Sequence, residues 1–381
     1  ILSIEDCIDA VDVETICILV GMMLLVAVIK NSGIFEYIAI KAAKIAKGRP
    51  WPIMVIFILI TAVCSGMLDN VTTVLLVGPM TLAITNILKV DPVPYIITQI
   101  MASNIGGTAT LIGDPPNIMI GSAAKLSFVD FILNTGVATV FVIIVGLICM
   151  YFIYGRKLFV TDESIAKVMQ LDENKAIKDR KLMHESVIVI ILVALCFIFH
   201  DQLGVQSCTV AIAAACIMLL IGGQEPEEII ADVEWPTILF FIGLFIVVGG
   251  MKKVGVITML ANGLISITHG NMVVTMMVIL WVSAIVSSFL DNIPFVATLI
   301  PMILTMQSEG MDVAPIWWAL SLGACLGGNG TLIGASANVV LSGISKNNGH
   351  PITFGQYFKI GFPMMILSII VCSVFLLIRF A

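Results

Sequence analysis

The chain has 381 residues, of which 59% are hydrophobic and only 12% carry a charge, and its formal net charge is −6. Soluble domains average about 25% charged residues, so this composition, with a mean hydropathy of +1.10, excludes a soluble protein. The cysteines form no Cys-x-x-Cys pair and the histidines stand alone, which excludes a disulfide framework and the usual metal motifs. We therefore expect helices embedded in a bilayer.

Apolar segments that approach the length of a membrane span, about 20 residues, recur along the whole chain. They lie near residues 16–29, 129–154, 187–199, 205–221, 238–248 and 358–378. The stretch at 162–185 mixes both signs of charge and is expected to be a solvated linker. We divide the chain into a first repeat at 1–154, an inter-repeat linker at 155–185 and a second repeat at 186–381.

The segment after the first span has apolar residues at positions 34, 35, 38, 42 and 45, and lysines at 41, 44 and 47. This spacing predicts an amphipathic helix that lies along the membrane surface. Its counterpart in the second repeat, residues 254–268, is nearly uncharged.

Each repeat then places one carboxylate inside a long apolar stretch. Asp69 is the only charged residue within 50–88, and Asp291 is the only one within 254–308. A carboxylate at this depth costs at least a few kcal/mol and usually marks an ion path. An Asn follows each Asp, and the stretch is either two full spans or a hairpin that turns back there. We favour the re-entrant hairpin, because non-helical backbone is tolerated at depth where it lines a polar cavity.

A glycine-rich break follows each hairpin. Residues 106–117 read Gly-Gly-Thr-Ala-Thr-Leu-Ile-Gly-Asp-Pro-Pro-Asn, and residues 327–338 read Gly-Gly-Asn-Gly-Thr-Leu-Ile-Gly-Ala-Ser-Ala-Asn. Such residues prevent one continuous helix, free backbone carbonyls and expose the N-terminus of a half-helix. Carbonyl, Asn and Thr oxygens suit Na⁺ and helix N-termini suit anions, so both kinds of ligand are expected near the midplane.

The same order of motifs returns 221 or 222 residues later, which is typical of a transporter built from two related halves. Basic clusters at 30–49 and 156–181 should lie in the cytoplasm. With both clusters inside, the span at 13–30 runs inward and its counterpart at 235–251 runs outward. The expected fold is an all-α polytopic membrane protein with two inverted repeats, each containing a re-entrant helical hairpin and a broken transmembrane helix.

The two halves differ at their starts. Two spans precede the motif Asp232-Val233-Glu234, whereas only eleven residues precede the equivalent Asp12-Val13-Glu14. We therefore expect an N-terminal helix pair to be missing from the first repeat. The protein is expected to be a multi-pass component of a cell membrane, such as a bacterial inner membrane, with its linker in the cytoplasm.

Asp114 breaks the repeat, because Ala335 stands at the equivalent position. Burial favours the protonated form of a carboxyl group and a bound cation favours the ionised form, so Asp114 is a candidate for coupling proton release to Na⁺ uptake. Structural roles stay open. The three Asp residues can cap helices, and the Gly-Gly pairs can be close helix contacts. Asn117 and Asn338 can cap the half-helices or contact an ion.

The run Asp69-Asn70-Val71-Thr72-Thr73, followed by residues 104–117, resembles the ArsB/NhaD permease family of the ion transporter superfamily. That family includes arsenite permeases, sodium/proton antiporters and the melanosomal P protein. More distantly, the chain is similar to sodium-coupled dicarboxylate and citrate carriers. The resemblance covers the entire chain. It implies an inverted-repeat fold with two re-entrant hairpins, a homodimer and elevator-type movement of a transport domain against a scaffold.

The hairpin tips depart from the carriers of di- and tricarboxylates, which have Ser-Asn-Thr there. Here the tips read Asp69-Asn70-Val71 and Asp291-Asn292-Ile293. An acidic tip repels a multiply charged anion, and no Arg or Lys lies inside the hairpins or broken helices. We therefore predict sodium/proton antiport, with efflux of arsenite or another oxyanion as the alternative and di- or tricarboxylate uptake ranked lower.

Two other classes of membrane protein share some of these features. An ion channel is a remote alternative that broken helices alone do not exclude. A membrane-embedded aspartyl protease would need a Gly-x-Gly-Asp motif, but Leu111 stands where its first Gly should be. We expect no enzyme activity.

The predicted site draws on both tips and both broken helices. Na⁺ and H⁺ are the expected coupling ions, without a cofactor, and Asp69, Asn70, Asp291 and Asn292 are candidate Na⁺ ligands. The expected partners are a small inorganic ion or oxyanion, the lipid bilayer and a second copy of the chain, with no nucleic acid. The candidate ion- and substrate-binding residues are Asp69, Asn70, Thr72, Gly106, Gly107, Thr108, Thr110, Asp114, Asn117, Asp291, Asn292, Gly327, Gly328, Asn329, Thr331 and Asn338.

Overall fold

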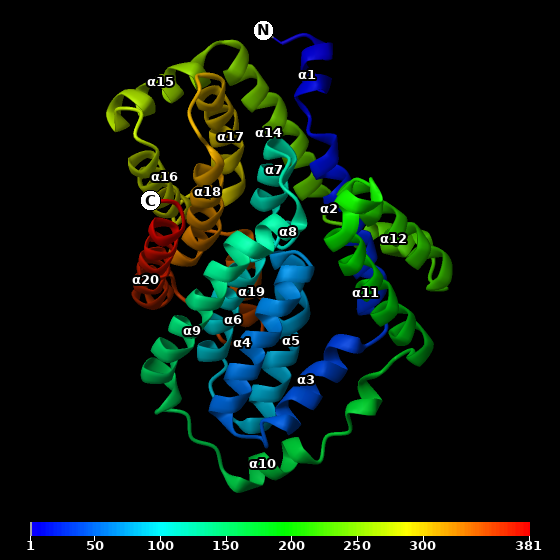
Figure 1. Cartoon of the computed structure of the whole chain (residues 1–381). Coiled ribbons are helices and arrows are strands. Elements are labelled where there is room, and N and C mark those ends of the chain that lie inside the picture. Colours follow the sequence, from blue (N-terminus) through cyan, green and yellow to red (C-terminus); the bar gives the residue numbers. More distant parts are fainter. Residues whose placement is uncertain (1) are drawn as a thin grey trace.

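The computed structural model describes residues 2–381, and every regular element in that part of the chain is a helix (Figure 1). The short 3₁₀ and π segments are labelled η. The elements up to residue 155 are α1 (Ile4–Ala10), α2 (Val13–Lys30), α3 (Ile34–Ile45), α4 (Pro50–Met67), α5 (Asn70–Leu88), α6 (Val93–Thr108), α7 (Pro115–Ala124), α8 (Phe128–Phe131), η1 (Ile132–Gly136), α9 (Val137–Met150) and η2 (Tyr151–Gly155).

The remaining elements cover the linker and the second half. They are α10 (Asp162–Met169), η3 (Glu173–Ala176), α11 (Arg180–Leu203), α12 (Ser207–Ile221), α13 (Pro226–Ala231), α14 (Trp235–Lys253), α15 (Val256–Thr268), α16 (Met272–Ser287), α17 (Asn292–Ser308), α18 (Ala314–Gly327), η4 (Gly328–Gly330), α19 (Ser336–Asn347) and α20 (Phe354–Phe380).

Seven of the described helices are long and apolar enough to cross a membrane. The number rises to eight if α15 and α16, which are bent by 118° at their junction, form one span. The expectation of an all-α polytopic membrane protein is confirmed. The amphipathic segment expected at 34–47 is the helix α3, and it buries Ile34, Phe35 and Ala39.

The first polar break joins α4 to α5. Two prolines, Pro50 and Pro52, lie in the first turn of α4. Backbone N–H groups in a first turn have no hydrogen-bond partner within the helix, so proline costs no hydrogen bond there. The helix ends at Met67, Leu68 is extended, and Asp69 caps the N-terminus of α5. In the second half, residues 288–291 join α16 to α17 in the same position.

Both glycine-rich segments interrupt a helix, as the sequence predicts. In the first half, α6 ends at Thr108 and the chain resumes a helix, α7, at Pro115. In the second half, α18 ends at Gly327, a 3₁₀ turn follows, and α19 begins at Ser336. Helix α7 begins with two prolines, so its first turn offers fewer N–H groups than that of α19.

Close backbone contacts hold each broken helix against its hairpin. A Cβ atom added at Gly106 would lie 2.1 Å from the carbonyl oxygen of Ala62 on α4. A Cβ atom added at Gly327 would lie 2.7 Å from the carbonyl oxygen of Ala284 on α16. Only glycine fits at these contacts, and the first glycine of each Gly-Gly pair therefore has a packing role.

The hairpins of the two halves interlock. Helix α5 packs against α19, and α17 packs against α7, so each half-helix contacts the hairpin of the other half. In Figure 1, α4 and α5 lie in the lower half of the view and α16 and α17 in the upper half. The tips of the two hairpins meet between them, and this meeting point positions the site.

Candidate functional site

Both hairpin tips and the starts of both half-helices line one polar pocket. Asp69, Asn70 and Val71 come from the first tip, Asn292 and Ile293 from the second, and Asp114, Pro115 and Ser336 from the half-helices. Met23 of α2, with Glu234 and Thr237 at the start of α14, completes the lining. The cavity volume is about 30 Å³, room for one or two water molecules or one bare monovalent cation.

The carboxylate of Asp69 caps α5. It accepts the Thr72 backbone N–H at 2.8 Å, and the Thr72 hydroxyl also donates to it. The side chain is buried and lines the pocket together with Asp114 and Glu234. Asp69 therefore does cap a helix, which the sequence left open as a structural role, and it also lines the pocket.

The carboxylate of Asp291 is held differently, because Pro294 stands where Thr72 stands in the first half. Proline has neither an N–H group nor a hydroxyl to donate. Asp291 instead accepts the Ile293 N–H at 3.0 Å and the Ser336 hydroxyl at 2.9 Å. It therefore lies beside the pocket, bonded to one of the lining residues.

Asp114 is buried and does not cap its helix. Although it is the N-terminal flanking residue of α7, its side chain accepts no N–H from that helix. The side-chain amide of Asn292 instead donates to its two carboxylate oxygens, at 3.4 and 3.2 Å. Asp114 is thus available for chemistry at the point where the two halves meet.

The counterpart of Asn292 in the first half is Asn70. The counterpart of Asp114 is Ala335, so Asn70 has no carboxylate to which it can donate. The side chain of Asn70 is only 4% exposed and lines the pocket. Within residues 2–381 it has no hydrogen-bond partner. A buried amide without a partner usually contacts a water molecule or a ligand, so Asn70 is the strongest pointer to a bound species.

Glu234 was not among the residues singled out from the sequence. It brings a fourth carboxylate to the site, and its only hydrogen bond with a described side chain comes from the Thr237 hydroxyl, at 3.2 Å. The signal in the sequence was the repeated Asp-Val-Glu at 12–14 and 232–234, which marks only the start of a span. Nothing in that pattern shows that α14 begins at the hairpin tips.

The asparagines of the two breaks brace the loops. The amide nitrogen of Asn117 donates to the carbonyl of Thr110 at 2.9 Å, and that of Asn338 donates to Thr331 at 2.9 Å. Neither residue lines the pocket. Several carbonyls that the breaks release are therefore already bonded, which leaves fewer for an ion than the sequence alone indicates.

A second residue missed from the sequence, Asn104 on α6, joins the two halves. Its amide nitrogen donates to Asn329 and Asn338, both at 2.9 Å. At the equivalent place on α18, the Cys325 thiol lies 3.5 Å from the Asn117 oxygen, which also accepts the Ser321 hydroxyl at 2.6 Å. These bonds hold α6 and α18 against the loop of the opposite half.

The other predicted site residues lie in the walls around these loops and do not line the pocket. The hydroxyls of Thr110 and Thr331 donate to backbone carbonyls at the ends of α4 and α16, and the Thr108 hydroxyl donates within its own helix. An added Cβ at Gly107 would lie 2.6 Å from the Gly113 oxygen, and one at Gly328 would lie 3.0 Å from the Ala335 Cβ.

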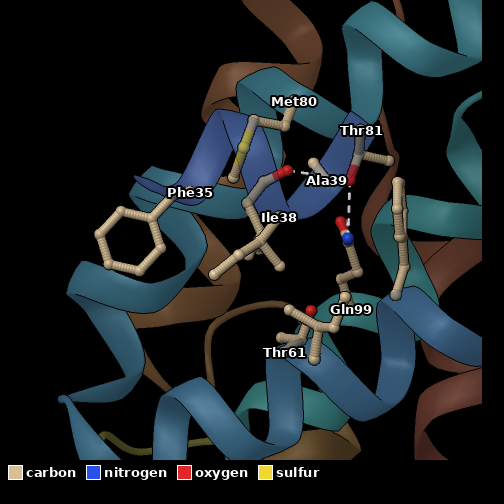
Figure 2. A pocket seen from close by; sticks show the side chains of 10 residues that line it. Phe35, Ile38, Ala39, Thr61, Met80, Thr81 and Gln99 are labelled. Atoms are coloured by element: carbon tan, nitrogen blue, oxygen red, sulfur yellow. Dashed lines mark hydrogen bonds between the residues drawn. The ribbon is translucent and has the colours of Figure 1, made fainter. Parts of the chain in front are cut away.

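A separate small cavity, of about 20 Å³, lies between α3, α4, α5 and α6 (Figure 2). Apolar side chains, including Phe35, Ile38 and Met80, form most of its wall. The Gln99 amide nitrogen donates to Thr81 at 2.6 Å, whereas Gln99 Oε1 and Thr61 Oγ1 have no partner in the described residues. The volume suits one water molecule bonded to these two atoms, and no ionisable group lines the cavity.

Comparisons with known proteins agree with a transport role. The family of citrate transporters, CitMHS, matches residues 1–323. An uncharacterized transporter of Mycobacterium bovis is 42% identical over 374 residues, which cover 97% of this chain and 87% of that protein. The P protein of Sus scrofa is 33% identical over 460 aligned residues, which cover 99% of this chain and 54% of the P protein.

The fold is also similar to a solved structure. The crystal structure of the YdaH transporter of Alcanivorax borkumensis superposes with a TM-score of 0.65 at 14% identity, over 94% of this chain and 84% of that one. At this identity the likeness shows the fold alone. These matches confirm that the chain is a membrane transporter and not an enzyme, whereas the narrower assignment to ArsB/NhaD permeases stays a prediction.

Proposed function

The chain belongs to the citrate transporter family, CitMHS, and from this premise we propose that it is a secondary transporter that exchanges a monovalent cation, most favourably Na⁺, for protons. The observation that carries the proposal is the composition of the central pocket. Asp69, Asp114 and Glu234 line it, and no Lys or Arg is among its described lining residues. Several carboxylates in one small pocket repel an anion and favour a cation or protons.

The exchange follows from the surroundings of Asp114. A protonated Asp114 leaves the pocket with one negative charge fewer, so the pocket binds a cation only weakly. When Na⁺ enters, the carboxyl group gives its proton to water, and the ionised oxygens contact the cation. The Asn292 amide holds the carboxylate in place in both forms. The products are bound Na⁺ and one released proton, so mass and charge balance at this site.

Asp69 and Asn70 supply the other oxygens. The Asp69 carboxylate is oriented by Thr72, and the Asn70 amide oxygen has no competing partner in the described part of the chain. Carbonyl and carboxylate oxygens are the ligands that hard cations prefer. Movement of the two hairpin tips, in an elevator-type exchange within a homodimer, would then expose the pocket to the two sides in turn.

Citrate is the second candidate. The description of the family favours it, and α19 begins at Ser336 without proline, so its N-terminus can donate to an anion. Two observations weigh against it. The cavity of about 30 Å³ is too small for citrate in this conformation, and no cationic side chain lines it within the described residues. Arsenite efflux, which needs no cationic partner, ranks third.

The test uses the purified protein in liposomes that contain a pH-sensitive dye. Na⁺, Li⁺, K⁺, arsenite and citrate are added in turn, and empty liposomes serve as the control. A fall of the internal proton concentration that follows the addition of Na⁺ or Li⁺ outside the liposomes supports the proposal, because entry of the cation is exchanged for exit of protons. A response to citrate alone would assign the protein to anion transport instead.

A further inference from the structure

We propose that Glu234 is a ligand of the exchanged cation, and that it binds this ion from the start of α14, which lines the pocket together with the hairpin tips. The inference rests on the proposed function and adds a residue of α14 to a site otherwise built from hairpins and broken helices. It is supported by the position of Glu234 in the pocket and by the partnerless amide of Asn70, which lines the same pocket.

The first step is that Glu234 has no structural task that explains it. As the N-terminal flanking residue of α14, it makes no capping bond with its side chain. Asp69 and Asp291, in the equivalent positions of α5 and α17, do accept backbone N–H groups. The Thr237 hydroxyl is its one donor among the described residues, which leaves most of its acceptor capacity unused.

The second step is charge. Glu234 lines the same small pocket as the carboxyl groups of Asp69 and Asp114, and Asp291 lies beside it, bonded to Ser336. The remaining elements that line the pocket contribute the neutral side chains of Met23, Asn292 and Ser336. Carboxylates that share one small pocket repel each other unless a proton or a cation lies between them. The pocket is large enough for such an ion.

The third step is the unsatisfied amide. Asn70 lines the same pocket and is buried, yet its side chain has no partner in the described chain. A cation held between Asp69 and Glu234 would accept the Asn70 carbonyl oxygen as a third ligand. One ion would thereby explain both the unpaired amide and the two carboxylates that share its pocket.

The fourth step concerns the side from which the ion enters. Lys30, at the end of α2, pairs with Asp232 at 2.7 Å. Two residues after Lys30, the Ser32 carbonyl accepts the backbone N–H of Lys178 in the linker at 3.0 Å. Glu234 comes two residues after Asp232, and Met23 lies about 10 Å before Lys30 along α2. Glu234 is therefore on the linker side of the pocket, and it is only half-buried.

A cation bound by both Glu234 and Asp69 would connect α14 to the first hairpin. The bound ion would hold the tip against α14, and loss of the ion would release it. Glu234 thus sets the affinity for the cation that enters from the linker side, whereas Asp114 on the opposite half-helix gives up the proton.

The test compares Glu234→Gln and Glu234→Asp with wild type in the liposome assay, with Glu228→Gln as the matched control. Glu228 is exposed on α13 and does not line the pocket. Loss of one charged ligand should raise the half-saturating Na⁺ concentration of Glu234→Gln by about tenfold or more. Glu234→Asp should recover part of the affinity, and the control should match wild type.

A second measurement covers the case in which Glu234→Gln carries no flux. Thermal melting of each purified protein is recorded over a Na⁺ series, and the melting curve without Na⁺ shows whether the variant is folded. A folded Glu234→Gln that needs the wild-type Na⁺ concentration for stabilisation would overturn the inference. A wild-type protein without any Na⁺ response would instead refute the proposed function itself.

Discussion

The side-chain amide of Asn292 lies 3.2 Å from a carboxylate oxygen of Asp114, although 178 residues separate the two positions in the chain. The contact joins the hairpin tip of one half to the broken helix of the other. Its counterpart cannot form, because Ala335 provides no carboxylate for Asn70. A duplicated site therefore carries one uncapped, buried carboxyl group and one unpaired amide, and the predictions below depend on this asymmetry.

Asp114→Asn should abolish cation-driven proton movement, because an amide at this position cannot exchange a proton in the physiological range. Any remaining Na⁺ flux in the liposome assay should become independent of pH. Asp91→Asn is the control, because Asp91 caps the start of α6 outside the pocket and Asn caps equally well. Wild-type pH dependence in Asp114→Asn would remove Asp114 from the mechanism.

Asn104→Ala should lower the free energy of unfolding by about 2 kcal/mol, because two buried hydrogen bonds between the halves are lost. The matched variant is Cys325→Ala, whose thiol, a weak donor, lies 3.5 Å from the Asn117 oxygen and also contacts Asp114, and which should cost clearly less. Thermal melting of the purified proteins measures the difference. Equal melting temperatures for the two variants would contradict this assignment of the bonds.

Gly106→Ala should prevent α6 from packing on α4, since the added Cβ would meet the Ala62 carbonyl oxygen at 2.1 Å. We expect little folded protein after purification. Gly146→Ala is the control, because nothing lies within 4 Å of a Cβ at that position of α9. It should be neutral or stabilise by up to about 1 kcal/mol, as alanine favours a helix over glycine. A stable, active Gly106→Ala would show that the helices can separate at this contact.

Glu173→Gln should loosen the linker from α3, although the Lys44 ammonium also donates to the Leu171 carbonyl. The Lys44 ammonium donates to Glu173 at 2.6 Å, and this bond holds the pKa of the carboxyl group below its ordinary value. A lowered pKa stabilises the docked linker above the ordinary pKa, about 4.3, and this contribution is lost as the pH falls below that value. Limited proteolysis at neutral pH should therefore cut Glu173→Gln faster than wild type.

The control for the linker is Glu163→Gln. Glu163 pairs with Lys167 on the same exposed turn of α10, so its loss should leave the rate of cleavage unchanged. Wild-type protein should resist cleavage at pH 7 and lose this protection only near pH 4. Equal cleavage rates for the two variants would show that the Lys44 contact does not hold the linker.

Much of the architecture follows from local features of the sequence. The breaks at 106–117 and 327–338 were predictable because glycine pairs and prolines cannot continue a helix in any context. The tips at Asp69 and Asp291 were predictable because a lone carboxylate in an apolar stretch has few other places to lie. That the hairpins are re-entrant and not pairs of full spans stays a prediction, as do the sidedness of the halves, the missing N-terminal pair and the homodimer.

The details of the site depend on contacts between distant segments and could not be predicted. The sequence does not show that α17 packs on α7, which brings Asn292 to Asp114, or that α14 starts at the tips, which brings Glu234 there. The bracing roles of Asn117 and Asn338 were also hidden, because an asparagine after a broken helix can equally cap it, bind an ion or hold the loop.

The most direct test of cation–proton exchange is uptake of radioactive sodium into liposomes that contain the purified protein and are loaded with an acidic buffer. The outward proton gradient should drive sodium into wild-type liposomes and not into those with Asp114→Asn, and a protonophore that collapses the gradient should stop the uptake. Sodium uptake that ignores the gradient, or accumulation of labelled citrate without any sodium uptake, would contradict the proposed exchange.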